Sequence, residues 1–168
     1  MCTGTPEYMA PEVVSGRGYN YGADWWGLGV LIYEMATGGC TPFESGTQHR
    51  VFQKILRHRG RGLGRTPSGA RGLTNVTMSV ISALLQPSPT HRLGCWRDGA
   101  EDIKQHEFFA GLDWDSLHAH ALSAPFIPPI LDAADTSRFS APVASPQSDS
   151  GAVRIEAPWL DEWGPIDC

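Results

Sequence analysis

The stretch from Asp24 to Thr37 constrains the fold of this 168-residue sequence more than any other part. It predicts a helix with Asp24 as its N-cap and with Gly38 and Gly39 as its stop. Its apolar residues occupy every face, and a helix that is apolar all round is usually buried in the middle of a domain. Such a helix needs many partners, whereas the rest of the sequence offers few strong helices. The sequence therefore predicts a helical protein whose packing around this segment is incomplete.

The other predicted elements are shorter, and hydrophobic spacing and turn residues define them. Val51, Ile55 and Leu56, for example, stand at helical spacing. The full set is a helical turn over 11–14, helices over 46–58, 75–86 and 99–106, and a loop rich in Gly and Arg over 59–73.

The composition changes from about residue 123 onward. Proline restricts its own backbone and that of the preceding residue, so the stretches 124–129 and 141–146 predict extended chain. Residues 140–158 are typical of a flexible linker. Bulky apolar residues follow among acidic ones, which predicts a tether that docks on a folded body. These apolar residues are Trp159, Trp163 and Ile166.

The charge is unevenly distributed along the chain. The net charge is −5, but residues 1–111 carry 11 basic and 9 acidic side chains, whereas residues 112–168 carry 2 and 9. An overall acidic protein is a poor candidate for general nucleic-acid binding. The stretch from Arg50 to Arg71 nevertheless holds seven Lys or Arg residues and no acid. We expect a solvated loop there, with contact to an acidic partner or to RNA as the alternative.

Metal sites and membrane spans are not indicated by the sequence. The four cysteines form no Cys-x-x-Cys pair, and no His stands at zinc-ligand spacing. The strongest apolar run, from Trp25 to Met35, is too short to span a bilayer. We therefore expect a cytoplasmic protein with reduced thiols, no metal and no membrane partner.

Three motifs point to a known family. Residues 4–12 read Gly-Thr-Pro-Glu-Tyr-Met-Ala-Pro-Glu and resemble the end of the activation segment of eukaryotic protein kinases. Residues 24–29 read Asp-Trp-Trp-Gly-Leu-Gly and resemble the motif that opens the central buried helix of that fold. Residues 91–94 read His-Arg-Leu-Gly and resemble its later Arg-containing segment. The resemblance implies a mainly α fold: the C-terminal half of a protein-kinase-like C-lobe, followed by an extended tail.

Further segments are similar to the AGC group of serine/threonine kinases. They are 24–35 in the apolar helix, and 124–128 and 135–139, which resemble the tail of that group. Segments 102–104, 108–109, 113–114 and 162–167 resemble kinases that depend on cyclic nucleotides, the last of these the cGMP-dependent ones. The resemblance implies a partial protein kinase domain over 1–109 and an AGC-type C-terminal tail over 110–168.

The parts that carry phosphoryl transfer in that family are absent from the sequence. Kinases use a Gly-rich loop, a strand Lys, an Asp-Phe-Gly metal ligand and a His-Arg-Asp catalytic loop, and none of these is present. In the family they lie N-terminal to the region that matches here. We therefore expect the sequence to be a fragment that is inactive alone and has no catalytic residue or metal ligand of its own.

The resemblance implies a substrate-binding role for five residues. Thr5 would hydrogen-bond the catalytic Asp and position the Ser or Thr of the substrate. Pro6 and Met9 would line the pocket for the substrate residue after the phosphoacceptor. A buried carboxylate without a partner is costly, so Glu34 needs a cation, which by resemblance is an Arg two residues before the phosphoacceptor. Glu7 would bind a more distant basic residue. A structural salt bridge with a local Arg is the alternative for both acids.

Four other residues would support the site by resemblance. Glu12 and Arg92 would form the buried ion pair that fixes the activation segment to the C-lobe. Asp24 would hold the backbone of the catalytic loop, in addition to capping its helix. Phe139 would close over the adenine, as the tail aromatic of AGC kinases does.

These observations predict part of a serine/threonine kinase that transfers the γ-phosphate of ATP, with Mg²⁺, to Ser or Thr of basic protein substrates. Its partners would be the kinase N-lobe and a cyclic-nucleotide-binding regulatory region, and the fragment alone would bind no cofactor. One alternative is a non-catalytic, kinase-derived module that binds basic peptides through Glu34 and Glu7. Another is a nucleic-acid-binding module that uses the Arg/Gly loop, against which the acidic net charge argues.

Overall fold

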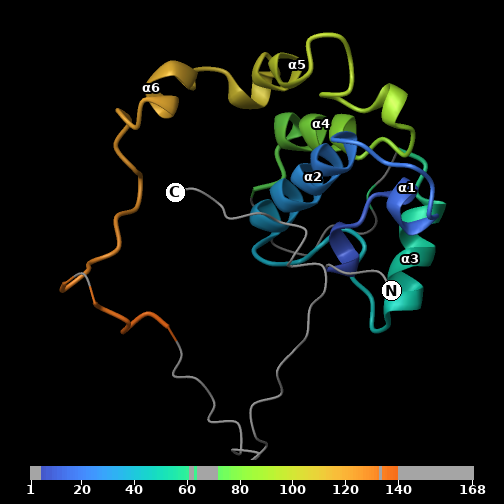
Figure 1. Cartoon of the computed structure of the whole chain (residues 1–168), viewed down its shortest axis with the longest axis horizontal. Coiled ribbons are helices and arrows are strands. Elements are labelled where there is room, and N and C mark those ends of the chain that lie inside the picture. Colours follow the sequence, from blue (N-terminus) through green and yellow to red (C-terminus); the bar gives the residue numbers. More distant parts are fainter. Residues whose placement is uncertain (1–4, 61–62, 64–71, 133, 140–168) are drawn as a thin grey trace, which may run out of the picture. The chain divides into compact units, whose positions relative to one another are not determined.

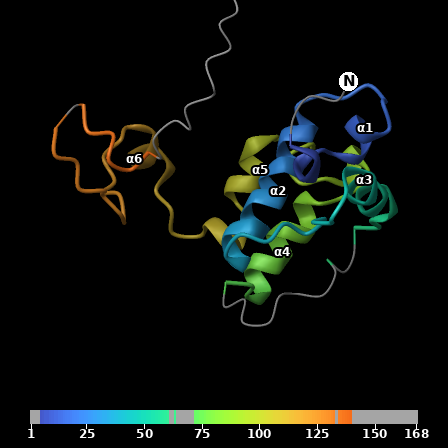
Figure 2. The same cartoon turned by 90° about the horizontal axis from the view of Figure 1, so that it is seen from below.

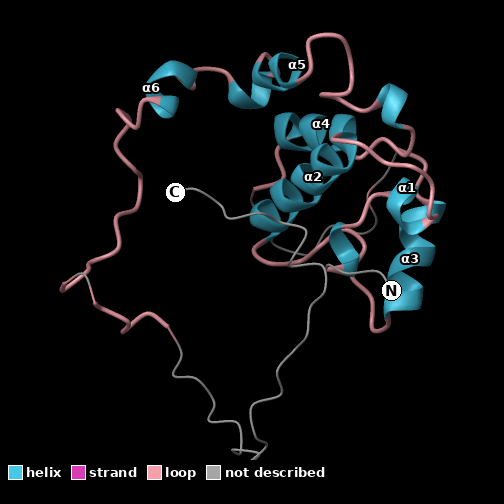
Figure 3. Cartoon of the chain, viewed as in Figure 1, coloured by secondary structure: helices cyan, strands magenta, loops and turns pink. Residues whose placement is uncertain are grey.

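A computed structural model describes residues 5–60, 63, 72–132 and 134–139. These residues form helices joined by loops and contain no strand (Figure 3). The prediction of a mainly helical chain is therefore confirmed. The elements in chain order are η1 (Pro6–Tyr8), α1 (Pro11–Val14), α2 (Gly22–Thr37), α3 (Gln48–Arg57), α4 (Asn75–Leu84), η2 (Pro89–His91), α5 (Ala100–Lys104), η3 (Glu107–Phe109) and α6 (Trp114–His118).

The chain divides into two compact units between Leu122 and Ser123. All helices that the structure describes belong to the first unit, in which α2 and α4 lie against each other (Figures 1 and 2). The domain boundary predicted between residues 109 and 110 concerns the family domain and stays a prediction. The first unit itself runs to Leu122 because α6 and the turn after it belong to it.

The helix α2 ends where the sequence predicts but begins two residues earlier. Gly38 adopts a left-handed conformation, with φ of 80°, and its N–H donates to the carbonyl of Glu34, which ends the helix. The prediction that Asp24 is the N-cap is wrong. The helix begins at Gly22, whose N–H donates to the side-chain oxygen of Asn20 at 2.9 Å. Asp24 lies in the first turn, where the helix dipole also favours an acid.

The core forms where α2 packs on α4. A side chain at Gly29 would place its Cβ 2.9 Å from Cβ of Leu84, so the two helices approach closely only because this residue is glycine. Trp26 is fully buried and stacks on Phe43, with ring centroids 5.4 Å apart and planes 8° from parallel. The prediction that the apolar helix is buried in the middle of a domain is confirmed on this side. Leu31 and Met35 stay exposed on another face of α2.

The two shorter amphipathic helices follow the predicted ranges closely. In α3, Val51 and Ile55 are buried as their spacing predicts, but Leu56 is exposed because it follows Ile55 by one position and so lies about 100° around the helix. Thr74 caps α4 by accepting the N–H of Thr77 at 3.1 Å. The turn predicted over 11–14 is α1. Most of the Arg/Gly loop over 59–73 lies outside the described residues.

The second unit, where described, contains neither helix nor strand. This agrees with the extended chain predicted over 124–129, whereas the stretch 141–146 lies outside the described residues. Its order is local: the carboxylate of Asp135 accepts the backbone N–H groups of Leu131 and Ser137, at 3.0 and 2.9 Å. These bonds favour the charged form and hold the pKa of Asp135 below its usual value.

Other predictions lie outside the described residues. They are the flexible linker over 140–158 and the apolar residues Trp159, Trp163 and Ile166. Among the helices that the structure describes, none has the length and apolar character needed to cross a bilayer.

Candidate functional site

The structure brings Glu12 of α1 and Arg92 together across 80 positions of sequence. The pair is bidentate: Nη1 of Arg92 donates to Oε1 of Glu12 at 2.7 Å, and Nη2 donates to Oε2 at 3.0 Å. Arg92 is 0% exposed and Glu12 is 8% exposed. A buried, two-pronged charge pair of this kind fixes geometry as well as contributing energy.

Arg92 also satisfies backbone carbonyls where α2 begins and where α4 has just ended. Its Nη1 donates to the carbonyl of Gly22, at the start of α2, at 2.7 Å. Its Nε donates to the carbonyl of Gln86, just after α4, at 3.0 Å. The guanidinium stands 5.3 Å from the ring centroid of Trp26. One side chain therefore ties α1, α2 and the segment after α4 into a single frame.

A second contact joins the N-terminal segment to α2. The hydroxyl of Tyr8, in η1, donates to Oε2 of Glu34, in the last turns of α2. This hydrogen bond, burial and the negative charge of Glu34 raise the pKa of Tyr8 to about 12. The hydroxyl therefore stays protonated at neutral pH and holds the carboxylate in one orientation. This partner was missed from the sequence, because only a cation was considered for Glu34.

Glu34 is half-buried and has no ion pair with any residue that the structure describes. The local salt bridge that the sequence left open is thus not found within the described ranges. With one oxygen bonded to Tyr8, the carboxylate retains lone pairs for further donors. A guanidinium is a suitable partner, because it matches a carboxylate in charge and in planar geometry.

The other predicted substrate residues lie within one short segment beside this contact. Thr5 is exposed, Pro6 and Glu7 are half-buried, and Met9 is 8% exposed. The N–H of Tyr8 donates to the carbonyl of Thr5 at 3.1 Å, so the segment forms one tight turn. The structure therefore brings all four close to Tyr8, which itself contacts Glu34.

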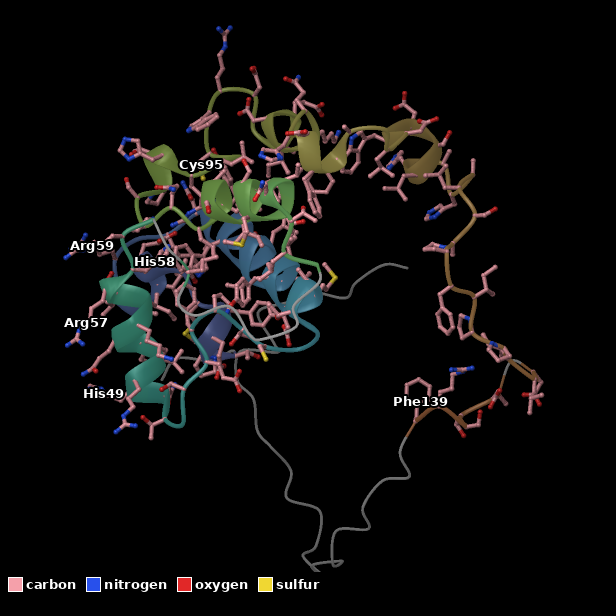
Figure 4. All side chains as sticks on the ribbon, turned by 180° about the vertical axis from the view of Figure 1, so that it is seen from behind. His49, Arg57, His58, Arg59, Cys95 and Phe139 are labelled. Atoms are coloured by element: carbon pink, nitrogen blue, oxygen red, sulfur yellow. The ribbon has the colours of Figure 1, made fainter. Side chains whose placement is uncertain are left out.

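The two remaining predicted residues, Asp24 and Phe139, belong to other segments of the chain. Asp24 is exposed at the start of α2, and its carboxylate has no hydrogen-bond partner among the described residues. Phe139 belongs to the second unit and is 76% exposed (Figure 4). The roles predicted for both involve groups that the described residues do not include.

The described residues do not fit ATP or Mg²⁺. No group of three His, Cys, Asp or Glu side chains within them is arranged to hold a metal ion. Phe139 is a single exposed aromatic, with no phosphate-binding loop in the sequence to accompany it. No chemical step through a nucleotide is therefore derived from these residues.

Comparison with known proteins gives the family of the chain. The model of a family described as "Protein kinase domain" matches residues 1–109. Ribosomal protein S6 kinase 2 beta of Xenopus laevis is 41% identical over 136 residues, which cover 81% of this chain and 20% of that protein. Serine/threonine-protein kinase N2 of Danio rerio is 37% identical over 149 residues, covering 85% of this chain and 14% of that protein.

A further relative carries a cyclic nucleotide in its name. The cAMP-dependent protein kinase catalytic subunit PRKX of Mus musculus is 38% identical over 136 residues, covering 81% of this chain and 36% of that protein. The chain thus spans between about a seventh and a third of these relatives. The fold prediction of a C-lobe portion agrees with the family match.

Proposed function

Since this chain belongs to the protein kinase domain family, we propose that it forms the substrate-facing part of the C-lobe of a serine/threonine kinase of the AGC group. The whole enzyme would transfer the γ-phosphate of ATP, with Mg²⁺, to Ser or Thr of basic protein substrates. The finer assignment, to the cyclic-nucleotide-dependent type, rests on the motifs, because an S6 kinase is as similar as the cAMP-dependent relative. Its partners would be the kinase N-lobe and a cyclic-nucleotide-binding region, in the cytoplasm.

The half-buried carboxylate of Glu34 is the observation that carries this proposal. Tyr8 orients it, and no described cation neutralises it. In our proposal Glu34 binds the guanidinium of an Arg two residues before the phosphoacceptor, because such a pair forms charge-assisted hydrogen bonds. Glu7 binds a more distant basic residue of the same substrate.

The short segment at η1 then positions the rest of the substrate. Thr5 holds the hydroxyl of the phosphoacceptor in place together with the catalytic Asp of the whole enzyme. Pro6 and Met9 form an apolar wall for the residue that follows the phosphoacceptor. The pair of Glu12 and Arg92 keeps this segment on the C-lobe, which is supported by its burial and its bidentate geometry.

Two further roles complete the proposal. Asp24, exposed at the start of α2, holds the backbone of the catalytic loop in the whole enzyme. Phe139 closes over the adenine from the tail. The chain alone is inactive, because its sequence lacks the Gly-rich loop, the catalytic Asp and the metal ligand.

The test is a chimera in which this chain replaces the matching region of mouse PRKX. We expect the chimera to phosphorylate a Ser peptide with Arg two residues before the acceptor, whereas the 168-residue chain alone transfers no phosphate. Glu34→Gln should lower kcat/KM for that peptide by about 10- to 100-fold, since a charge-assisted hydrogen bond is lost. Glu107→Gln, an exposed acid on η3, is the matched control and should change nothing.

The peptide series separates a binding role from a structural one. A peptide with Ala in place of that Arg should be phosphorylated equally by the chimera and by its Glu34→Gln variant. An equal loss on both peptides would mean that Glu34 only supports the fold. A folded chimera without any transfer would overturn the kinase proposal itself.

A non-catalytic module for basic peptides is the second candidate. It is favoured by the first unit having its own buried core while the Glu34 carboxylate has no described ion pair. In that case the 168-residue chain should bind a fluorescein-labelled Arg-rich peptide, and Glu34→Gln should abolish the binding. Absence of binding by the folded chain would leave the kinase role as the one supported.

A further inference from the structure

A cavity lies between α3 and the loop that follows α2, and none of the proposed kinase roles uses it. Its volume is about 510 Å³. Figure 4 shows Arg57 on α3 and His58 directly after the helix. The side chain of His58 is turned toward the body of the protein. The lining residues are Pro42, Phe43, Ser45, Arg50, Gln53, Lys54, Arg57, His58 and Leu63.

The base of the cavity is apolar. Phe43 is 3% exposed and Leu63 is 7% exposed, so both line the cavity while belonging to the core. Phe43 is fixed from behind by its stack on Trp26. His58 packs edge-on against Phe43, and a ring nitrogen is bonded to the carbonyl of Leu85 at 3.0 Å. Burial lowers the pKa of His58 below its usual value. The imidazole is therefore uncharged at neutral pH and adds no charge to the bottom of the cavity.

The wall of the cavity is positively charged. Arg50, Lys54 and Arg57 stand at positions i, i+4 and i+7 and therefore share one stripe of α3. In the described ranges none of them pairs with a carboxylate. Lys54 donates to the backbone carbonyl of Glu44, and the side chain of Glu44 does not line the cavity. Three positive charges thus lie along one wall beside an apolar base, and none of them has an ion pair among the described residues.

The spacing of these charges indicates the shape of the ligand. Seven residues of helix rise about 10 Å, so the stripe from Arg50 to Arg57 is long enough to contact two separate carboxylates. An extended peptide rises about 3.3 Å per residue and turns every second side chain to the same side, so acidic residues four positions apart can both face this stripe, within reach of its long side chains. A side chain between them would face the apolar base.

We propose that this cavity binds an acidic peptide segment of a protein partner. An apolar side chain of the peptide contacts Phe43 and Leu63, and carboxylates on either side of it contact Arg50, Lys54 and Arg57. RNA fits less well, because the Phe43 ring is 3% exposed and already stacks on Trp26, so its face is not open to a base. The ligand is opposite in charge to the substrate of the Glu34 site, so this proposal stands apart from the proposed kinase function.

The test measures fluorescence polarisation with the 168-residue chain. The probe is a labelled peptide with two acidic residues four positions apart and one Leu midway between them. An amide version, with Asn and Gln in place of the acids, should bind more weakly, and equal binding of the two peptides would overturn the proposal. The double variant Arg50→Glu/Arg57→Glu should weaken binding by about tenfold or more, because two attractive pairs become repulsive. The matched control Arg17→Glu/Arg97→Glu reverses the same number of exposed charges elsewhere and should change the affinity by less than about twofold.

A second variant tests the cavity without changing charge. Ser45→Trp fills the space beside Phe43 and should weaken binding of the Leu peptide, while circular dichroism confirms the helical fold. If the control double variant lost as much affinity for the peptide, the effect would be due to net charge alone, and this result would overturn the proposal. So would a Ser45→Trp chain that binds as well as the parent, no binding of the peptide, or tighter binding of a labelled oligouridine than of the peptide.

Discussion

The two units of the chain differ in how far their large apolar side chains are exposed to solvent. In the first unit Trp26, Ile55 and Leu84 are completely buried. In the second unit Phe126, Leu131 and other large apolar residues are between 66% and 88% exposed. The first unit therefore has a core of its own, whereas the described part of the second is ordered by prolines and by backbone bonds to Asp135.

This difference predicts where substitutions will change the free energy of unfolding. Burial of apolar surface is the dominant favourable contribution to folding, so the free energy of unfolding should depend on the first unit alone. The following predictions test this expectation. They begin with a buried charge in the first unit and end with exposed rings in the second.

The largest effect is expected for Arg92→Ala. It leaves the buried Glu12 without a partner and removes the hydrogen bonds to the carbonyls of Gly22 and Gln86. Urea titration followed by circular dichroism should show a loss of about 3–5 kcal/mol. Arg97→Ala, at an exposed Arg, should stay within about 0.5 kcal/mol of the parent. A small loss for Arg92→Ala would show that the frame does not depend on this pair.

Two glycines of α2 should respond in opposite directions. Gly29→Ala places a Cβ 2.9 Å from Leu84 and should destabilise the chain by about 1–3 kcal/mol, because the two helices must separate. Gly27→Ala meets no atom within 4 Å and should stabilise the same helix by about 1 kcal/mol through helix propensity. Thermal denaturation of both variants measures the difference, and equal shifts would contradict the close packing of α2 on α4.

The Tyr8–Glu34 contact predicts a dependence on alkaline pH. The pKa of Tyr8 is raised from 10.0 to about 12, so the folded state holds this proton more tightly than the unfolded state does. The contribution is complete below pH 10 and is lost as pH rises through 12. Urea midpoints across this window should fall more steeply for the parent than for Tyr8→Phe. Identical slopes would mean that the hydroxyl of Tyr8 is not bonded to Glu34.

The smallest effect is expected in the second unit. The double variant Phe126→Ser/Phe139→Ser removes two exposed aromatic rings and should leave the free energy of unfolding within about 0.5 kcal/mol of the parent. The urea midpoint is the measurement. A clear loss of stability would show that these rings are buried in solution and would remove the contrast between the two units.

The sequence was a good guide where one residue pattern decides the structure. The end of α2 was predicted because an apolar run followed by two glycines has few other solutions. Its start was not predicted correctly, because an acid in the first turn and an acid at the cap gain from the same helix dipole. The side chain of Asn20, which does accept the N–H of Gly22, stands outside the apolar pattern.

Contacts between distant segments were harder to predict. The Glu12–Arg92 contact was expected only through family resemblance, since nothing in the local sequence joins residues so far apart. Tyr8 was overlooked because a half-buried carboxylate was assumed to need a cation, although a hydroxyl donor also satisfies it. The cavity beside α3 was not predicted from the sequence, because its apolar base and its charged wall come from separate segments. The basic residues alone suggested a solvated loop, with an acidic partner or RNA as the alternative.

The contact between Glu12 and Arg92 also bears on the order of folding. It closes a loop of 80 residues, and loop-closure entropy must be overcome before such a contact contributes stability. The interface of α2 and α4 spans a shorter separation and buries more apolar surface. We therefore expect the ion pair to form after the folding transition state, on a core that already exists. A substitution that breaks it would then accelerate unfolding and leave the folding rate nearly unchanged.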